Sequence, residues 1–157
     1  MVCRLLLYFR SGLPLNVTVS RSSSTVLPDG NNVNQRPNRV PGVSIYSSNR
    51  GITSWLNPLA FKVPDAGTWG NAGRNIAGGP NFWQDDVALE KLFSVTERYK
   101  VIFRAEAFNL FNRAQYGQPS GSFNTASFGH ITSVINTTGL VGTGTPRQME
   151  FALRLNF

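Results

Sequence analysis

The chain has 157 residues, of which 41% are hydrophobic and only 15% are charged, with a formal net charge of +7. This length fits one ordinary domain, and because globular domains carry about 25% charged residues, the deficit favours a β-protein with much of its surface out of water. The arginines are scattered from Arg4 to Arg154 without a basic stripe, so no nucleic-acid partner is expected.

The first predicted strand covers residues 4–20. Its apolar residues take odd positions, namely Leu5, Leu7, Phe9, Leu13, Leu15, Val17 and Val19. The alternation continues across Gly12 and Pro14, which we expect to bend the strand or to lie near an edge. The apolar run near the N-terminus is too short for a signal peptide and no cleavage site follows it, so it is interpreted as part of this strand.

The second and third strands are predicted over residues 83–95 and 99–110, joined by a short polar connection at 96–98. Both segments alternate with a period of two. Residues 99–110 also contain good helix formers, but the two-residue period is clearer than any helical stripe, so a strand is preferred over a helix.

The fourth strand is predicted over residues 147–157, at the end of the chain. Its odd positions hold Met149, Phe151, Leu153, Leu155 and Phe157, and its even positions hold Gln148, Glu150, Ala152, Arg154 and Asn156. A strand with one apolar and one polar side and this length matches the roughly 9–11 residues that cross a bilayer.

The connections alternate between long and short. Residues 21–82 and 111–146 form long loops, and the 96–98 turn lies between them. This rhythm is typical of an outer-membrane barrel, with short periplasmic turns and long extracellular loops. We therefore expect an all-β, antiparallel, partial transmembrane β-barrel of about four strands, in one unit that covers residues 1–157.

The predicted orientation places the 96–98 turn and the C-terminus on the periplasmic side. Phe93, Tyr99 and Phe157 then lie at one depth and form a periplasmic aromatic girdle. The charges predicted to face the lumen are Glu90, Arg104, Glu106, Glu150 and Arg154. In this register Arg104 lies near Glu90 on one neighbouring strand and near Glu150 on the other; these charges either pair across strands or are simply solvated.

The sequence offers little for catalysis or for metal binding. Cys3 is the only cysteine and His130 the only histidine, so a disulfide, a zinc site and a Ser-His-Asp triad are not expected. No enzyme activity and no cofactor are therefore predicted. The aromatic residues Trp55, Phe61, Trp69 and Trp83 could form a sugar- or peptide-binding surface, but packing is the preferred interpretation.

Several motifs in combination resemble the C-terminal end of TonB-dependent outer-membrane receptors, in particular the Oar-like group with a carboxypeptidase-regulatory-like domain. They are Ser11-Gly12-Leu13-Pro14-Leu15, Asn34-Gln35-Arg36-Pro37-Asn38-Arg39, Trp55-Leu56-Asn57-Pro58-Leu59-Ala60-Phe61, Gly67-Thr68-Trp69-Gly70-Asn71-Ala72-Gly73-Arg74-Asn75, Phe103-Arg104-Ala105-Glu106-Ala107-Phe108-Asn109-Leu110-Phe111-Asn112, Phe128-Gly129-His130-Ile131, Pro146-Arg147-Gln148 and the terminal Phe157.

The resemblance implies a plugged barrel of about 22 strands in the outer membrane of a Gram-negative type bacterium. Such a receptor takes up a large or scarce ligand with energy passed on by TonB. The plug and the TonB-contacting segment are expected in an N-terminal part outside this sequence, so the fragment is not expected to transport alone. The expected partners are outer-membrane lipid, the unknown transported ligand and the barrel-assembly machinery, for which Phe157 resembles the assembly signal.

A second hypothesis is a soluble β-sandwich or an adhesin-like surface binding module. It would bury the apolar strand faces between two sheets. Four strands with long loops are few for such a sandwich, so the barrel is the preferred prediction. The chain's need for detergent distinguishes the two.

Overall fold

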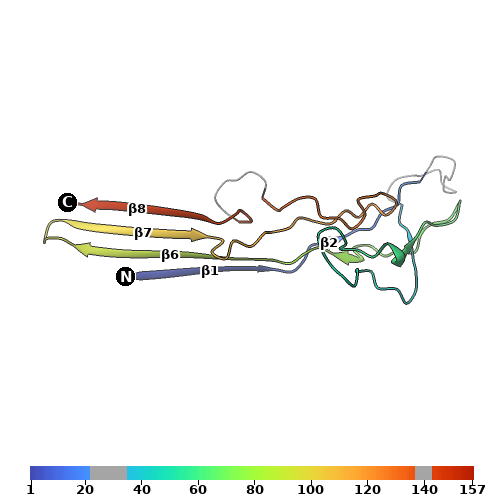
Figure 1. Ribbon diagram of the computed structural model, residues 1–157, viewed down its shortest axis with the longest axis horizontal. Helices are drawn as coiled ribbons and strands as arrows, with labels where there is room; N and C mark the ends of the chain where they lie inside the picture. The colour runs from blue at the N-terminus through green and yellow to red at the C-terminus, as the bar shows by residue number, and fades with distance from the viewer. Residues whose placement is uncertain (22–34, 137–142) are drawn as a thin grey trace. The chain divides into compact units, whose positions relative to one another are not determined.

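The computed structural model describes residues 1–21, 35–136 and 143–157. The chain divides into two compact units (Figure 1). The first, here called the sheet unit, comprises Met1–Ser11, Asn81–Tyr116 and Val134–Phe157. The second, the loop unit, comprises Gly12–Pro80 and Gly117–Ser133. The predicted loops 21–82 and 111–146 lie partly outside the described residues.

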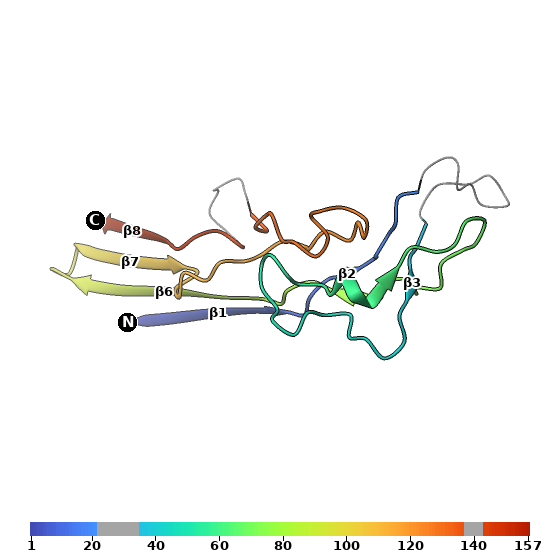
Figure 2. The same ribbon diagram turned by 45° about the vertical axis from the view of Figure 1, so that its right-hand side comes forward.

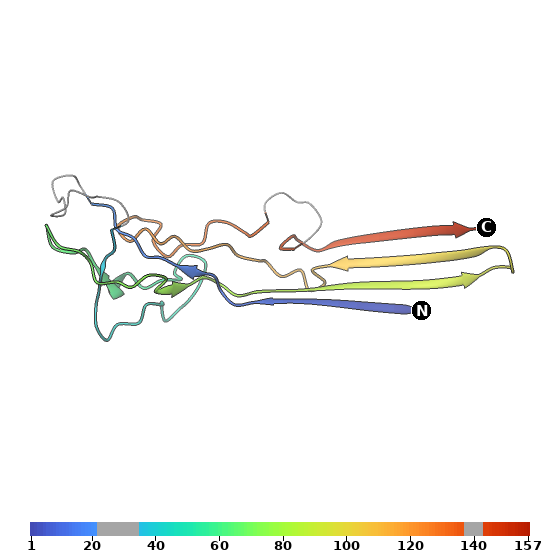
Figure 3. The same ribbon diagram turned by 180° about the vertical axis from the view of Figure 1, so that it is seen from behind.

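The sheet unit contains a four-stranded antiparallel sheet. Its strands are β1 (Val2–Arg10), β6 (Phe82–Ser94), β7 (Lys100–Phe108) and β8 (Gln148–Asn156). They lie in the order β1-β6-β7-β8, so each pairs with its successor among the long strands (Figures 1 and 3). The predicted all-β, antiparallel fold is confirmed. The sheet is open, because β1 and β8 lie at opposite edges.

A tight turn joins β6 to β7, as predicted. The backbone amides of Val95 and Thr96 both donate to the carbonyl oxygen of Tyr99, at 3.0 and 3.2 Å. The amide of Tyr99 in turn donates to Oγ1 of Thr96 at 3.1 Å. These bonds satisfy the backbone where the strand ladder ends, so the hairpin register is fixed locally.

The predicted first strand, 4–20, is wrong in its extent. β1 begins at Val2 and ends at Arg10, and β2 (Pro14–Leu15) belongs to a different, two-stranded sheet. A Cβ atom on Gly12 would lie 1.9 Å from the carbonyl oxygen of Gly79, so only glycine permits the close approach of the two segments there. The chain therefore leaves the long sheet at this point instead of continuing in register.

The loop unit is built from short pieces rather than from long strands. β2 pairs with β5 (Ala77–Gly78), and β3 (Asn38–Arg39) pairs with β4 (Phe61–Lys62) (Figure 2). A short 3₁₀ helix, η2 (Pro58–Ala60), precedes β4. Asn57 caps it, because its Oδ1 accepts from the amide of Leu59 at 3.1 Å. The predicted loop 21–82 thus contains defined elements.

This unit has a hydrophobic core of its own. The buried residues are Val17, Leu56, Ala60, Phe61, Ala77 and Phe128. Phe61, Phe123 and Phe128 contact one another with ring centroids 5.4–5.8 Å apart. Burial of three aromatic rings in tilted and edge-on contacts stabilises a unit that has few ladder hydrogen bonds. In the described part of the chain, no helix is long and apolar enough to cross a membrane.

Candidate functional site

The strand register gives the sheet two faces of different chemistry. Every directly opposed pair joins two odd or two even residue numbers, as in Leu5 with Val87 and Ala105 with Phe151. All odd-numbered strand residues therefore share one face, here called the odd face, and all even-numbered ones share the even face. The odd face comprises Cys3, Leu5, Leu7, Phe9, Trp83, Asp85, Val87, Leu89, Lys91, Phe93, Val101, Phe103, Ala105, Ala107, Met149, Phe151, Leu153 and Leu155.

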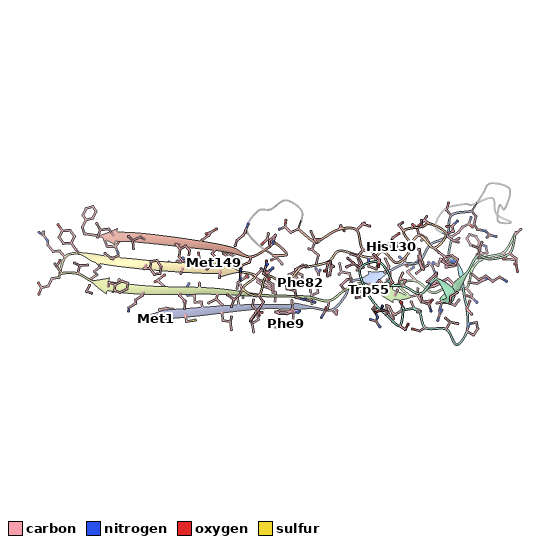
Figure 4. All side chains as sticks on the ribbon, in the orientation of Figure 1. Met1, Phe9, Trp55, Phe82, His130 and Met149 are labelled. Carbon is pink, nitrogen blue, oxygen red and sulfur yellow. The ribbon has the colours of Figure 1, made fainter. Side chains whose placement is uncertain are left out.

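The odd face is apolar and exposed. Phe9 on β1 is 73% exposed and Leu153 on β8 is 74% exposed. Figure 4 shows Phe9 and Met149 on the two edge strands. Phe103 and Phe151 stack with ring centroids 6.3 Å apart, although both rings remain exposed. A continuous apolar surface over four strands marks contact with something other than water.

The odd face carries two charged side chains, and each lies toward an end. Asp85 lies two residues from Trp83 and is only 8% exposed. Lys91 lies two residues from Phe93, and its Nζ is 4.8 Å from the centre of that ring. The ammonium group is thus directed toward the turn, as a lysine does when it carries its charge to a membrane interface. Between Asp85 and Lys91, the odd-face residues of β6 are Val87 and Leu89.

Aromatic residues lie at both ends of this face. At the turn end, Tyr99 and Phe157 lie one position beyond the Lys100–Asn156 pair, and Phe93 lies two positions deeper, opposite Val101. At the other end, Trp83 contacts Phe111 with centroids 6.0 Å apart, and the guanidinium of Arg113 lies 5.0 Å from the Trp83 ring. The alternating pattern of the sequence did not predict this second aromatic group.

The spacing of the two aromatic ends fits a bilayer. From Trp83 to Phe93 the chain advances ten residues along β6, which is ~33 Å at the rise of an antiparallel strand. A strand tilted by about 40° would span ~25 Å of the membrane normal, which is the height of the apolar band of outer-membrane barrels. The girdle predicted at Phe93, Tyr99 and Phe157 stays a prediction, but these residues lie at the expected end.

The even face holds the charges that the sequence assigned to the lumen. Glu90, Arg104, Glu106, Glu150 and Arg154 all lie on it. Glu90 lies directly opposite Arg104, as expected, whereas Glu150 lies opposite Glu106 and therefore diagonal to Arg104. The ion pair that forms runs along β7 instead, with Nη2 of Arg104 2.6 Å from Oε1 of Glu106.

A hollow of about 400 Å³ lies over the sheet on the even side. It is lined by charged residues of three strands, Arg4, Asp86, Arg104 and Glu106, together with apolar neighbours. Charged groups of both signs therefore reach this side of the sheet, beside apolar side chains. Four charged side chains thus gather at this hollow, whereas the odd face carries two, one toward each end.

A buried polar cluster fixes the sheet at the end opposite the turn. Asn109 follows β7 with a φ of 50° and is 1% exposed. Its Nδ2 donates to the carbonyl oxygens of Arg113 and Thr145 at 2.9 and 2.8 Å, and its amide donates to Oδ1 of Asp86 at 2.9 Å. Gln84 donates to the same Oδ1 at 2.8 Å. In the sequence, this cluster corresponds to the motif Asn109-Leu110-Phe111-Asn112.

The remaining candidates from the sequence are possible metal ligands and the loop aromatic residues. Among the described residues, no group of three or more His, Cys, Asp and Glu side chains could hold a metal ion. Packing is confirmed for Phe61, which is 4% exposed, and for Trp55, whose Nε1 donates to the carbonyl oxygen of Gly78 at 2.8 Å. Trp69 is exposed. Figure 4 shows Trp55 and His130 within the loop unit.

The comparisons with known proteins agree with this geometry. The model of the family described as "outer membrane beta barrel domain" matches residues 4–150. Comparison with curated proteins and with solved structures finds no match. The match covers β6 and β7 in full, β1 except its first two residues, and the first three residues of β8. The chain therefore belongs to the outer membrane β-barrel domain family, and it is an outer-membrane protein.

Proposed function

We propose that this chain is part of a TonB-dependent receptor that takes up a large or scarce ligand through the outer membrane, without catalysis. The observation that carries the proposal is the combination of an apolar odd face with a charged even face on four paired strands. This is the pattern of a barrel wall with lipid on one side and a polar lumen on the other. The motifs around Trp69 and Phe108 support the narrower assignment to Oar-like receptors.

The two edges of the sheet imply further strands in the working barrel. β1 pairs only with β6 and β8 only with β7, so one side of each edge strand lacks a ladder within the described residues. Each unpaired backbone group in lipid costs on the order of several kcal/mol. A membrane barrel must therefore close. These four strands are proposed to be a segment of a larger barrel wall and to be unable to transport a ligand by themselves.

The orientation follows from the connections. The tight turn between β6 and β7 lies at the periplasmic side, together with Phe157, which is proposed as the signal that the barrel-assembly machinery recognises. The segments Gly12–Pro80 and Gly117–Ser133 belong to the connections that leave the strands at their other ends. They are proposed to be extracellular, where a receptor meets its ligand. Contact with TonB is proposed for another part of the receptor.

The experiment uses the protein expressed from its own gene in its own cells. Outer membranes are isolated, and a photo-crosslinker in the C-terminal domain of TonB tests for contact. A TonB-dependent receptor should need detergent for extraction and should crosslink to TonB, as a known receptor in the same cells does. Extraction with detergent but no crosslink, while the known receptor reacts, would favour an adhesin-like surface protein instead.

A further inference from the structure

A polar hollow of about 380 Å³ lies within the loop unit. It is lined by Asn16, Thr18, Arg36, Arg74 and Asn75. Three separate segments of the chain therefore meet there, and they bring two guanidinium groups, a hydroxyl and two carboxamides to one surface. Among the residues that the structure describes, neither an acidic nor a large apolar side chain lines the hollow.

Three other arginines of the loop unit have structural contacts. Arg21 donates to the carbonyl oxygens of Pro64, Asp65 and Thr68 at 2.6–3.0 Å. Arg39 donates to the carbonyl oxygens of Ala60 and Val43 at 2.6 and 2.9 Å. Arg50 lies over the rings of Tyr46 and Trp55, 4.1 and 5.6 Å from their centres. These side chains fasten the unit together.

Arg36 and Arg74 differ from them. Within the described residues, neither guanidinium group makes a hydrogen bond, an ion pair or a ring contact. Each guanidinium carries five N–H donors in a planar fork that matches a carboxylate or a phosphate. Two such forks that face one hollow leave many donors available for a ligand.

The backbone around the hollow is held in place. The amide of Asn75 donates to Oδ1 of Asn16 at 2.8 Å, and the amide of Val19 donates to the carbonyl oxygen of Gln35 at 3.0 Å. A Cβ atom on Gly70 would lie 1.9 Å from the carbonyl oxygen of Arg36, so a glycine is needed for this close approach. A site whose framework is already ordered loses less entropy when a ligand binds.

The charge of the unit selects the sign of the ligand. Its described residues contain six basic side chains, Arg21, Arg36, Arg39, Arg50, Lys62 and Arg74, and one acidic side chain, Asp65. A positive surface raises the local concentration of anions and speeds their association. A hollow of this size, at the low end of small-molecule sites, accommodates an organic anion or a phosphate group.

We propose that the loop unit binds a small, soluble ligand by its oxyanion groups, carboxylate or phosphate, between Arg36 and Arg74, with Thr18, Asn16 and Asn75 as further polar contacts. This site deepens the proposed function. It rests on that function in one respect, namely that the bound ligand is the molecule taken up. Binding itself requires neither TonB nor transport, so the site and the transport proposal fail in different experiments.

The test is calorimetric titration of the full protein in a zwitterionic detergent at low ionic strength. The probes are citrate and inorganic phosphate, with chloride as the reference anion. We expect Arg36→Gln and Arg74→Gln each to weaken binding of the better probe by about tenfold, which is the loss of one or two charged hydrogen bonds. Arg36→Lys keeps the charge but loses the fork, and it should weaken binding less than Arg36→Gln.

The matched control is Arg98→Gln, which removes the same charge from the exposed turn of the sheet unit. It should leave the affinity unchanged to within about twofold, since Arg98 does not line the hollow. Equal losses of affinity in Arg36→Gln, Arg74→Gln and Arg98→Gln would show a general charge effect and overturn the site. The proposed site would also be overturned if neither citrate nor phosphate bound. It would be overturned as well if the protein bound only soluble short-chain phosphatidylglycerol, because the two arginines would then bind lipid headgroups.

Discussion

An arginine in place of Ala105 tests whether the odd face meets lipid. Ala105 pairs with Leu89 and Phe151 on its two neighbouring strands. Leu89 lies six residues from Trp83 and four from Phe93, or ~20 and ~13 Å along the strand. The substitution therefore places a charge near the middle of the apolar band. Arginine at that depth costs about 2–4 kcal/mol, which is a roughly 30- to 700-fold loss in the folding equilibrium.

The matched control is Ala88→Arg, which introduces the same side chain on the even face. Ala88 lies opposite Glu106 on one strand and opposite Arg4 on the other, so attraction and repulsion offset each other. It also lines the hollow of about 400 Å³, which has room for a long side chain. We expect a change within about 1 kcal/mol, the usual range for exposed charges.

The assay is guanidinium unfolding of the protein, produced from its own gene and folded into phosphatidylcholine vesicles, with tryptophan fluorescence as the signal. The fraction of heat-modifiable protein in isolated outer membranes provides a second measurement in cells. Ala105→Arg should lower both quantities, whereas Ala88→Arg should lower neither. Similar losses from both variants, or a larger loss from Ala88→Arg, would refute the assignment of the odd face to lipid.

Two further predictions concern the ends of the sheet. Asn109→Ala removes the side chain that donates to the carbonyl oxygens of Arg113 and Thr145, so the free energy of unfolding should fall by about 1–3 kcal/mol in the same assay. Asn109→Gly also lacks these hydrogen bonds, but glycine suits the φ of 50°, so this variant should recover the part of the loss that comes from backbone strain. Phe157→Ser should slow assembly into the outer membrane in a pulse-chase experiment, while Phe9→Ser, at the other end of the odd face, should not; equal assembly rates for Phe157→Ser and the parent would remove Phe157 as the assembly signal.

The three later strands could be predicted because each belongs to a single sheet and keeps the same two faces along its length. The strands expected over 83–95, 99–110 and 147–157 are observed over Phe82–Ser94, Lys100–Phe108 and Gln148–Asn156. An alternating pattern reports a fixed pair of surroundings, one apolar and one polar, and that condition holds here. The turn at 96–98 then fixed the register, which placed Glu90 opposite Arg104.

The extent of the first strand was predicted wrongly because its alternating pattern comes from residues in two different environments. Leu5, Leu7 and Phe9 are odd-face residues, 49–73% exposed. Val17 and Val19, which continue the odd numbering, are 1% and 4% exposed and pack within the loop unit. Between them Gly12 crosses close to Gly79, a contact between residues far apart in the sequence. Local periodicity cannot report a contact of that kind.

The loop unit could not be predicted for a related reason. Its core joins Val17, Leu56, Phe61 and Phe128, which come from distant parts of the sequence and follow no common period. The segments that contain them are rich in glycine, proline and asparagine, residues that usually indicate turns. The hollow between Arg36 and Arg74 depends on this packing, so the sequence identified these arginines as parts of motifs without indicating a site.

The way in which the loop unit satisfies its backbone explains the role of two of its arginines. Its paired strands are only two residues long, so few carbonyl oxygens have ladder partners. Buried carbonyl groups need donors, and a guanidinium supplies several at once without adding an acceptor. Arg21 and Arg39 each bond two or more carbonyl oxygens in this way. These two arginines thus stabilise an irregular fold, and part of the net charge of +7 has a structural role.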